Sequence, residues 1–332
     1  GHTLSGPGIE DNGTAGIYIA GGEEPLSQIN IKECDISAYQ IGLYAGHLEG
    51  GKVEHTNAMR NSSIGFYIIG SSGLTLSKNT LVGNDPDGIL ILGSSNITVT
   101  NNLAYYNRMR GITFEGCDSC TVSANESHSH GVLGFAIYAS KDMILENNIA
   151  HDNRYHGFAI LHEAGSATFR GNSSYNNDST GFYVEDSQNN QYLENESWGN
   201  TLDGIAIFGD SQPVKLDKNT LRDNDGFGVF SDSRLDNQTT SSNTFSGNQR
   251  GEISNLNHDE IDPCIYTGFG PQGECDPVFQ GGPNLKDPEV NESSELAPAE
   301  QGENETVIIG ARIEGDPLFF PSMGDLWMPT WS

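Results

Sequence analysis

The segment at positions 148–165, NIAHDNRYHGFAILHEAG, contains three histidines, two carboxylates, an arginine and a tyrosine. Imidazole, phenol and carboxylate groups are the usual proton donors and acceptors in enzymes, and guanidinium groups neutralise carboxylates. The segment therefore has the side chains needed for acid–base chemistry on an anionic substrate. Whether it performs that chemistry depends on which of these side chains the fold places on one surface.

A repeat of 23 or 24 residues decides which side chains share a surface. Its clearest mark is a glycine followed by an apolar residue, which recurs at these steps from Gly42 to Gly228. Asparagines form a first column nine residues before most of these glycines, namely Asn79, Asn102, Asn125, Asn148, Asn172, Asn195 and Asn219, with Asn243 continuing it at a gap of eight. A second column lies five residues further on, namely Asn61, Asn84, Asn107, His130, Asn153, Asn177, Asn200, Asn224 and Asn248.

Each repeat unit predicts three short strands. Alternating apolar residues follow the glycine, as in GFYIIG at 65–70 and GFAIYA at 134–139, and this period of two is typical of strands. A second apolar run follows, such as LTLS at 74–77, and a third apolar or small residue follows the first asparagine column. The pattern predicts a right-handed parallel β-helix of about 10–11 coils over residues 1–255. We expect the asparagines to adopt left-handed turn geometry and to hydrogen-bond along the stack.

The position three residues after the first asparagine column forms an outward row in this register. Its members are Met59, Val82, Tyr105, His128, His151, Tyr175, Trp198 and Arg222. We expect the row to face solvent because its neighbours in sequence face the core. Tyrosine, histidine and tryptophan rings suit sugar rings, which pack on aromatic faces. The alternative is that the rings pack only against one another along the stack.

A group of basic and aromatic residues is expected beside this row and would attract a polyanion such as a polyuronate. The residues predicted to bind such a substrate are Arg108, Arg110, Tyr155, His156 and Trp198. The residues predicted to act in catalysis, if the polymer is modified, are Tyr105, His128, His151, Arg154 and Tyr175.

Metal binding is the other chemistry that the row allows. His128 and His151 could share zinc or copper, with His130 or Asp152 as a third ligand. These side chains are expected at different angles around the coil, so the sequence predicts no metal site here. The turns NDPDG at 84–88 and DNDG at 223–226 offer carboxylates to calcium, although such turns are more common without an ion.

Composition restricts the partners and the location. The net charge is −29, from 16 basic and 45 acidic residues, which argues against nucleic acid and against an anionic membrane surface. No run of 18 apolar residues occurs, so no membrane span is predicted. Sequons of the N-x-S/T type favour an extracellular or cell-surface glycoprotein. The glycosylation sites predicted from them are Asn12, Asn61, Asn96, Asn237, Asn291 and Asn304.

The cysteines and the end of the repeat define the remaining regions. Cys264 and Cys275 bracket a Gly/Pro-rich loop, which predicts a disulfide-stapled region at 256–280. Cys117 and Cys120 form either a local disulfide or two free thiols, and Cys34 is left over. Residues 281–306 are linker-like in composition, and residues 307–332 form an apolar segment that would serve as a cap or a docking strand.

Three lines of the repeat, ENNIAHDNRYHGFAI, RGNSSYNNDSTGFYV and ENESWGNTLDGIAI, carry a resemblance to a known family. Over roughly residues 10–250 the chain resembles the catalytic module of mannuronan C5-epimerases. It also resembles the wider group of carbohydrate-binding and copper-associated periplasmic β-helix repeat proteins. The family's Tyr-Gly-Phe-Asp-Pro-His motif falls on LGFAIY at 133–138, where Gly134 and Phe135 match, but Ala136 replaces the catalytic Asp and Tyr138 the His. The resemblance implies an acidic polysaccharide partner, and epimerisation or β-elimination of a uronate.

Two hypotheses follow. In the first, a secreted or cell-surface β-helix binds an acidic polysaccharide through the outer face of its middle coils, and modifies it by lyase or C5-epimerase chemistry. In the alternative, the chain is a structural subunit that self-associates without catalysis. Its open first coil, which begins in mid-pattern with GHTLSGPG, would pair with the apolar segment 307–332 of another copy.

Overall fold

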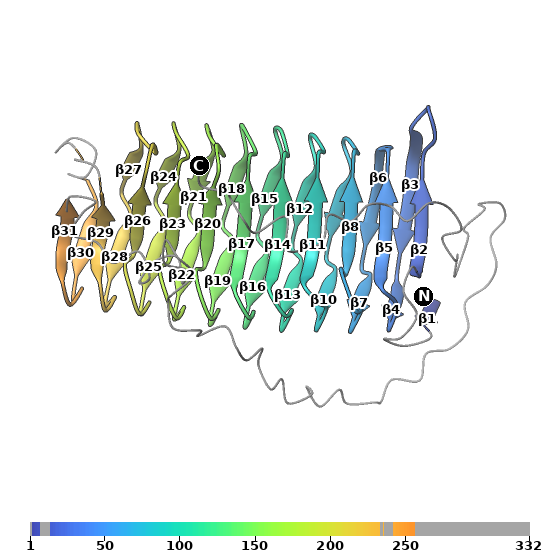
Figure 1. The fold of residues 1–332 in the computed structure, drawn as a ribbon, viewed down its shortest axis with the longest axis horizontal. Helices are drawn as coiled ribbons and strands as arrows, with labels where there is room; N and C mark the ends of the chain where they lie inside the picture. Colours follow the sequence, from blue (N-terminus) through green and yellow to red (C-terminus); the bar gives the residue numbers. More distant parts are fainter. Residues whose placement is uncertain (1, 7–13, 233–234, 236–241, 256–332) are drawn as a thin grey trace, which may run out of the picture.

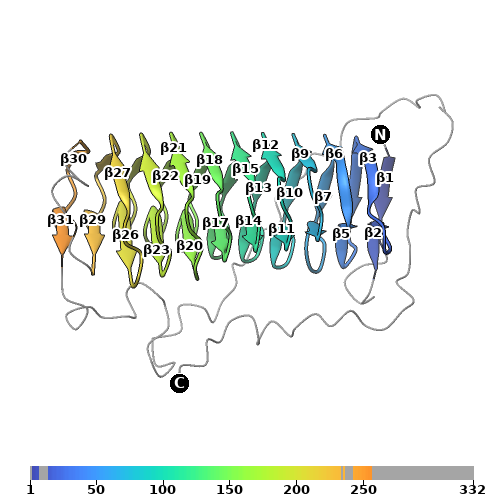
Figure 2. The same cartoon turned by 90° about the horizontal axis from the view of Figure 1, so that it is seen from above.

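The chain winds into a long stack of coils, each of which contributes one strand to each of up to three parallel sheets (Figures 1 and 2). The computed structural model describes residues 2–6, 14–232, 235 and 242–255. Each strand pairs in parallel with its equivalent one coil further on, as Ala104 of one coil does with Ser127 of the next. The prediction of a parallel β-helix with a repeat near 23 residues is confirmed.

Sheet 1 contains 11 strands. They are β1 (His2–Ser5), β4 (Cys34–Ser37), β7 (Asn57–Met59), β10 (Thr80–Val82), β13 (Leu103–Tyr105), β16 (Glu126–His128), β19 (Ile149–His151), β22 (Ser173–Tyr175), β25 (Glu196–Trp198), β28 (Thr220–Arg222) and β30 (Thr244–Ser246). Most of these strands are only three residues long, so the middle residue faces the core and its two neighbours face outward.

Sheets 2 and 3 complete the coils, with 11 and 9 strands. Sheet 2 consists of β2 (Ala15–Ala20), β5 (Ile41–Gly46), β8 (Phe66–Ile69), β11 (Asp87–Leu92), β14 (Arg110–Glu115), β17 (Leu133–Tyr138), β20 (Phe158–Leu161), β23 (Phe182–Glu185), β26 (Ile205–Phe208), β29 (Phe227–Ser231) and β31 (Gly251–Asn255). Sheet 3 consists of β3 (Leu26–Lys32), β6 (Leu48–Glu54), β9 (Thr75–Ser77), β12 (Thr98–Thr100), β15 (Thr121–Ser123), β18 (Ile144–Glu146), β21 (Thr168–Arg170), β24 (Gln191–Leu193) and β27 (Lys215–Asp217). The part of the chain described here contains no helix that could cross a membrane.

The inward side chains of the three sheets form one continuous apolar core. Phe135, Phe158 and Phe182 lie in successive coils, and their rings stack with centroids 4.7 and 4.8 Å apart. All three are fully buried, and burial of such a side chain contributes about 1.5–3 kcal/mol. Because equivalent residues lie one above another, an apolar residue kept at one repeat position builds a column of the core.

The two asparagine columns hydrogen-bond along the stack inside the corners of the coils. Asn148 is fully buried, and its Nδ2 donates to Asn172 Oδ1 at 3.0 Å and to the Val122 carbonyl at 2.9 Å. The expectation that these asparagines take the left-handed turn conformation is wrong. In the first column it is the preceding residue that has positive φ, as Asn147 does at 55° before Asn148. The asparagines of the first column therefore hydrogen-bond along the stack, and the residue before them adopts the left-handed turn conformation.

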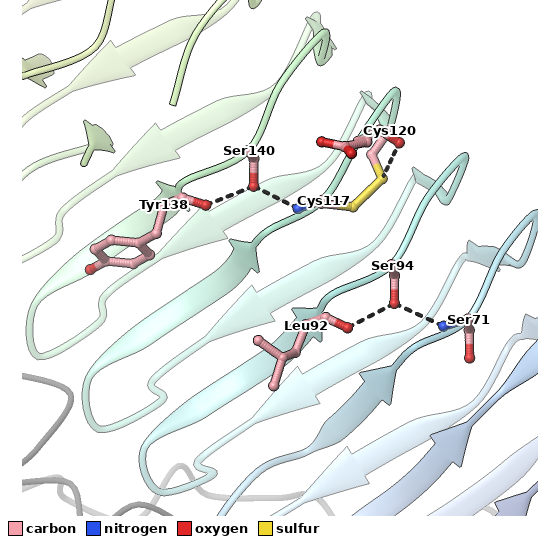
Figure 3. Close-up of a disulfide and its surroundings, with 8 residues drawn as sticks. Ser71, Leu92, Ser94, Cys117, Cys120, Tyr138 and Ser140 are labelled. Atoms are coloured by element: carbon pink, nitrogen blue, oxygen red, sulfur yellow. Dashed lines mark hydrogen bonds between the residues drawn. A yellow bond between two sulfur atoms is a disulfide. The ribbon is translucent and has the colours of Figure 1, made fainter. Parts of the chain in front are cut away.

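A serine row lies at the corner between sheets 2 and 3 (Figure 3). The backbone N–H of Ser71 donates to Ser94 Oγ at 3.1 Å, and that of Cys117 donates to Ser140 Oγ at 2.9 Å. Cys117 occupies a serine position in this row and forms a disulfide with Cys120. The structure thus has the disulfide, one of the two alternatives for this pair, and Cys34 is a buried free thiol.

Several predictions of the sequence lie outside the described residues. They are the regions 256–280, 281–306 and 307–332, the Cys264–Cys275 disulfide, and the sequons at Asn12, Asn237, Asn291 and Asn304. Glycosylation of Asn61 is wrong, because this side chain is 1% exposed and its Nδ2 donates to Asn84 Oδ1 within the second column. Asn96 is exposed at a turn, and its glycosylation stays a prediction.

Candidate functional site

Five aromatic side chains form a continuous stack on the outer face of sheet 1, which we call the ring ladder. Its members, in successive coils from β13 to β25, are Tyr105, His128, His151, Tyr175 and Trp198. Neighbouring ring centroids are 4.4–5.4 Å apart and the planes are within 11° of parallel. The Arg222 guanidinium covers the far face of Trp198, 4.8 Å from its ring centroid. The outward row predicted from the repeat is therefore present.

The stack decides what the ring ladder can bind. Coils of parallel strands repeat at about 4.8 Å, which is close to the stacking distance of aromatic rings, so the rings cover each other's faces. The first interpretation of the sequence, that sugar rings pack on these aromatic faces, is therefore wrong for the inner members. The alternative, that the rings pack on one another, is the one observed. The inner rings of the ring ladder can therefore meet a partner only at their edges.

Tyr106 provides the open ring that the ring ladder lacks. Its side chain is 38% exposed, and it meets Tyr105 edge to face with centroids 5.6 Å apart. Tyr106 occupies a corner position with φ of 53°, where other coils have residues such as Ser129 or Asp152. Sequence reasoning missed it because the corner position carries no repeating apolar pattern. A bulky aromatic residue at a corner that is otherwise small or polar was the available signal.

His151 lies between two carboxylates. Its Nδ1 is 2.7 Å from Asp152 Oδ2, and its Nε2 is 3.1 Å from Glu126 Oε1. Glu126 was not predicted, although it lies two residues before His128 on the same strand and so on the same face. The side chain of His151 is 13% exposed, so the imidazole is held within the stack while both carboxylates reach solvent.

The protonation states of the neighbouring rings follow from burial. Desolvation, reinforced by His151, lowers the pKa of His128, so this imidazole is neutral at pH 7. Its Nδ1 lies 3.0 Å from Ser129 Oγ. Burial, followed by the charges of Glu126 and Asp152, raises the pKa of Tyr175, which therefore keeps its proton and can donate a hydrogen bond. The ring ladder thus combines a neutral imidazole with a protonated phenol.

His130, considered as a metal ligand, points into the coil instead. It replaces an asparagine of the second column, and its Nδ1 accepts a hydrogen bond from the Asn107 backbone N–H at 3.1 Å. Its Nε2 lies 3.0 Å from Ser127 Oγ, which itself donates to the Gly134 carbonyl. Burial lowers the pKa of His130 to about 3. His130 therefore cannot join His128 in a surface site.

Two of the predicted arginines lie beside the ring ladder. Arg108 and Arg154 occupy the same corner position two coils apart, three residues beyond Tyr105 and His151, and both are exposed. Arg108 Nη1 forms an ion pair with Asp85 at 2.8 Å, a contact that solvent screens. These two cations support the predicted attraction for an anionic polymer.

The other predicted substrate-binding residues belong to the outer side of sheet 2. Arg110 is largely buried, and its Nε donates to the fully buried Asp87 at 2.9 Å; Asp87 raises the pKa of Arg110 against the effect of its burial. His156 is 2% exposed and stacks on Tyr183 with centroids 4.4 Å apart. Tyr155 packs against His156 and an apolar cluster beside it. The predicted substrate-binding role at the ring ladder is wrong for Arg110 and His156, because both side chains are buried on the outer side of sheet 2. Tyr155 lies in the same region and not at the ring ladder.

The turns considered for calcium already use carboxylates in ion pairs. Asp85 pairs with Arg108 and Asp87 with Arg110 in the first turn, and Asp223 pairs with Arg222 in the second. Calcium binding stays a prediction. A shallow depression of about 520 Å³ lies at turns bordering sheet 3, lined mainly by small polar residues such as Ser27, Ser72 and Asn96, and it brings no acid–base pair together.

Comparison with known proteins agrees with this architecture. The family description "Right handed beta helix region" matches residues 110–263, and "Periplasmic copper-binding protein (NosD)" matches residues 3–155. The chain is a right-handed parallel β-helix repeat protein. No curated protein matches it in sequence.

Solved structures give the particular likeness. The chain is similar to the periplasmic alginate epimerase AlgG at 20% identity and a TM-score of 0.57, covering 69% of this chain and 61% of that one. It is also similar to the A-module of the Azotobacter vinelandii mannuronan C-5 epimerase AlgE4, at 17% identity and a TM-score of 0.59, covering 77% and 82%. The Agl-KA catalytic domain matches at 13% identity and a TM-score of 0.56, covering 77% and 57%. At these identities the likeness concerns the fold, and the chain spans about three fifths of the AlgG structure.

Proposed function

We propose that the chain binds an acidic polysaccharide along the ring ladder. The observation that carries this proposal is the row of stacked rings from Tyr105 to Trp198 on the outer face of sheet 1, with one tyrosine, histidine or tryptophan per coil. A polysaccharide presents hydroxyl groups at a regular repeat, so a regular row of donors and acceptors can meet many of them at once. Rigid aromatic side chains lose little conformational entropy when they bind.

The acidic character of the polymer is supported by the charges at the corner. Arg108 and Arg154 are exposed three residues beyond Tyr105 and His151, the first and third members of the ring ladder, where they can meet uronate carboxylates. Tyr106 offers an exposed ring for one sugar face. The fold is shared with alginate epimerases, whose polymer is acidic.

An extracellular or cell-surface location is part of the same proposal. A disulfide joins Cys117 to Cys120, and disulfides persist mainly in oxidising compartments. Two of the similar proteins, the NosD family and AlgG, are described as periplasmic. A polysaccharide partner fits a location outside the cytoplasm.

Chemical modification of the polymer is a second candidate, favoured by the contact of His151 with Tyr175. In this scheme His151 removes the C5 proton of a uronate while Arg154 neutralises its carboxylate. In epimerisation a proton returns to the opposite face of C5 from a second group, for which Tyr105, His128 and Tyr175 are the candidates. In β-elimination the C4–O bond breaks, a C4–C5 double bond forms, and the leaving oxygen takes a proton from Tyr175.

Binding is tested by calorimetry with alginate, polygalacturonate and a neutral dextran. We expect the double variant R108Q/R154Q to bind the acidic polymers at least about tenfold more weakly, since each charged hydrogen bond contributes about 1.5–3 kcal/mol. Arg170→Gln, which removes an exposed arginine of sheet 3, is the matched control and should bind normally. Equal binding by the double variant, or no binding to any acidic glycan, contradicts the proposal. Absorbance of unsaturated uronate and NMR of the product test modification separately.

A further inference from the structure

We propose that Glu126, His128 and His151 form a binding site for a divalent transition-metal cation of the zinc or copper type. Each of the three residues offers one ligand atom, and these atoms lie within 4.8 Å of one another on the outer face of sheet 1. It is the one such group of three ligands in the part of the chain that the structure describes. The site shares His128 and His151 with the ring ladder, so its test measures metal binding in the absence of any polysaccharide.

The contacts of His151 are the first argument for a cation. A neutral imidazole has one N–H and one lone pair, so it can donate a hydrogen bond to only one carboxylate. Here Asp152 faces Nδ1 at 2.7 Å and Glu126 faces Nε2 at 3.1 Å. The contact of Nε2 with Glu126 therefore needs either a second proton on the ring or a cation between the two atoms, and a metal ion can take that place. Two ligands of one tetrahedral zinc ion are about 3.4 Å apart, so the observed separation needs little adjustment.

Asp152 completes the arrangement around His151. Histidine ligands usually donate their second ring N–H to a carboxylate or carbonyl, which fixes the tautomer and the orientation of the ring. The Asp152 carboxylate holds Nδ1 in this way and leaves Nε2 as the ligand atom. Asp152 is thus a positioning residue of the site.

His128 supplies the third ligand at the cost of one stacking contact. Its Nδ1 contacts Ser129 Oγ, so Nε2 is the nitrogen that we assign to the ion. The rings of His128 and His151 are parallel with centroids 4.7 Å apart, and parallel rings direct their lone pairs side by side. The His128 ring therefore has to tilt toward His151 when the ion binds, which opens its contact with Tyr105.

The donor set selects the class of ion. Two imidazoles and one carboxylate suit zinc and copper, whereas calcium and magnesium prefer sites made of oxygen ligands. Three protein ligands also leave a position open for water or for a carboxylate from a bound molecule. One matched family, over residues 3–155, is described as copper-binding, and these three residues fit copper as well as zinc.

The test is metal binding to the full chain, measured by calorimetry and by competition with a chromogenic chelator, with Zn²⁺ and Cu²⁺ in separate runs. All proteins carry His2→Ser, which removes an exposed imidazole near the start of the chain. We expect one ion per chain and at least tenfold weaker binding in each of Glu126→Gln, His128→Gln and His151→Gln. Glu126→Gln keeps the stack intact, so its effect does not depend on refolding of the ring ladder.

The control variant is His55→Asn. His55 is an exposed histidine beside Glu54, outside the cluster, and its φ of 50° suits asparagine. It should bind as tightly as the parent, and thermal melts should show that every variant folds. With Cu²⁺, electron paramagnetic resonance should show two coordinating imidazole nitrogens in the parent and one in His128→Gln. The proposal is overturned if the parent binds no more tightly than H128Q/H151Q, or if Glu126→Gln leaves the affinity unchanged.

Discussion

The second asparagine column and the ring ladder are two rows built by the same coils, two residues apart in sequence, and they use polar side chains in opposite ways. In the column, Asn177 Nδ2 donates to Asn200 Oδ1 and its Oδ1 accepts from Asn153, so these polar atoms are bonded inside the molecule. In the ring ladder, Tyr175 contacts its neighbours through ring faces and keeps a polar edge outside. The side of the corner on which a residue falls therefore decides whether it supports the fold or faces a partner.

The two histidines of one coil show the same difference. His128 lies in the ring ladder and His130 in the column, and burial lowers the pKa of both. His130 is enclosed by backbone and serine groups, whereas His128 is next to a carboxylate and a second imidazole. A pair of histidines two residues apart would usually be assigned to one face, but the corner between them reverses the direction of the second.

The largest effect is expected from breaking the column. Asn177→Ala removes the oxygen to which the buried backbone N–H and Nδ2 of Asn153 both donate. It also removes the Nδ2 bond to Asn200 Oδ1, although that oxygen keeps the backbone N–H of residue 177 as a partner. Each unsatisfied buried group costs about 1–3 kcal/mol, so we expect a loss of about 3 kcal/mol or more in the free energy of unfolding. Urea unfolding followed by circular dichroism measures it. A loss below that of Tyr175→Leu would contradict the comparison.

A smaller, pH-dependent effect is expected at His130. Its folded-state pKa, about 3, lies below the ordinary value of 6.5, so the unfolded chain takes up a proton that the folded chain does not. The stability that depends on neutral His130 is complete above pH 6.5 and falls as the pH drops toward 3. At pH 4.5 the loss is about 2–3 kcal/mol, from about 1.4 kcal/mol per pH unit.

His130→Asn should remove this acid sensitivity. The substitution completes the asparagine column between Asn107 and Asn153. The new side chain can donate to Ser127 Oγ, because in another coil Asn177 Nδ2 donates to the equivalent Ser174 Oγ at 3.2 Å. We expect the free energy of unfolding of the variant to exceed that of the parent by about 2–3 kcal/mol at pH 4.5 and by much less at pH 7.5. Unfolding curves at the two pH values measure the difference. Identical pH dependence of the two proteins would show that His130 is not the group responsible.

The sequence predicts the coils and the outward row because both follow from spacing alone. Glycines at steps of 23 or 24 define the register, and the period of two after each glycine defines the faces of sheet 2. The register also places Tyr105, His128 and His151 in one row. These features need no knowledge of distance, so one sequence is enough to derive them.

Features that depend on distance or on a corner could not be predicted in the same way. The sequence left two alternatives for the rings of the outward row, packing on sugars or on one another, because the choice between them depends on the spacing of the coils rather than on residue types. Arg110 is buried because an apolar cluster and Asp87 cover the outer side of sheet 2, although the outside of a sheet is normally solvated. Glu126 was not predicted because its position, the first outward one of each strand, carries no repeating residue type, as Leu103 and Ile149 of the neighbouring coils show.

The smallest expected effect is on the stability contributed by the ring ladder. Two substitutions of Tyr175 distinguish the role of its ring from that of its hydroxyl. Tyr175→Leu removes two ring contacts, with His151 and Trp198, and aromatic pairs contribute about 0.5–1.5 kcal/mol, so we expect a loss of about 1 kcal/mol. Tyr175→Phe keeps both contacts and should unfold like the parent. If the ring edges bind a polysaccharide, Tyr175→Phe should still weaken polymer binding, because the outward hydroxyl is gone. Unfolding and polymer binding measured on the same two variants separate the roles, and a Phe variant that loses stability but binds normally would place the hydroxyl in the fold rather than at the partner.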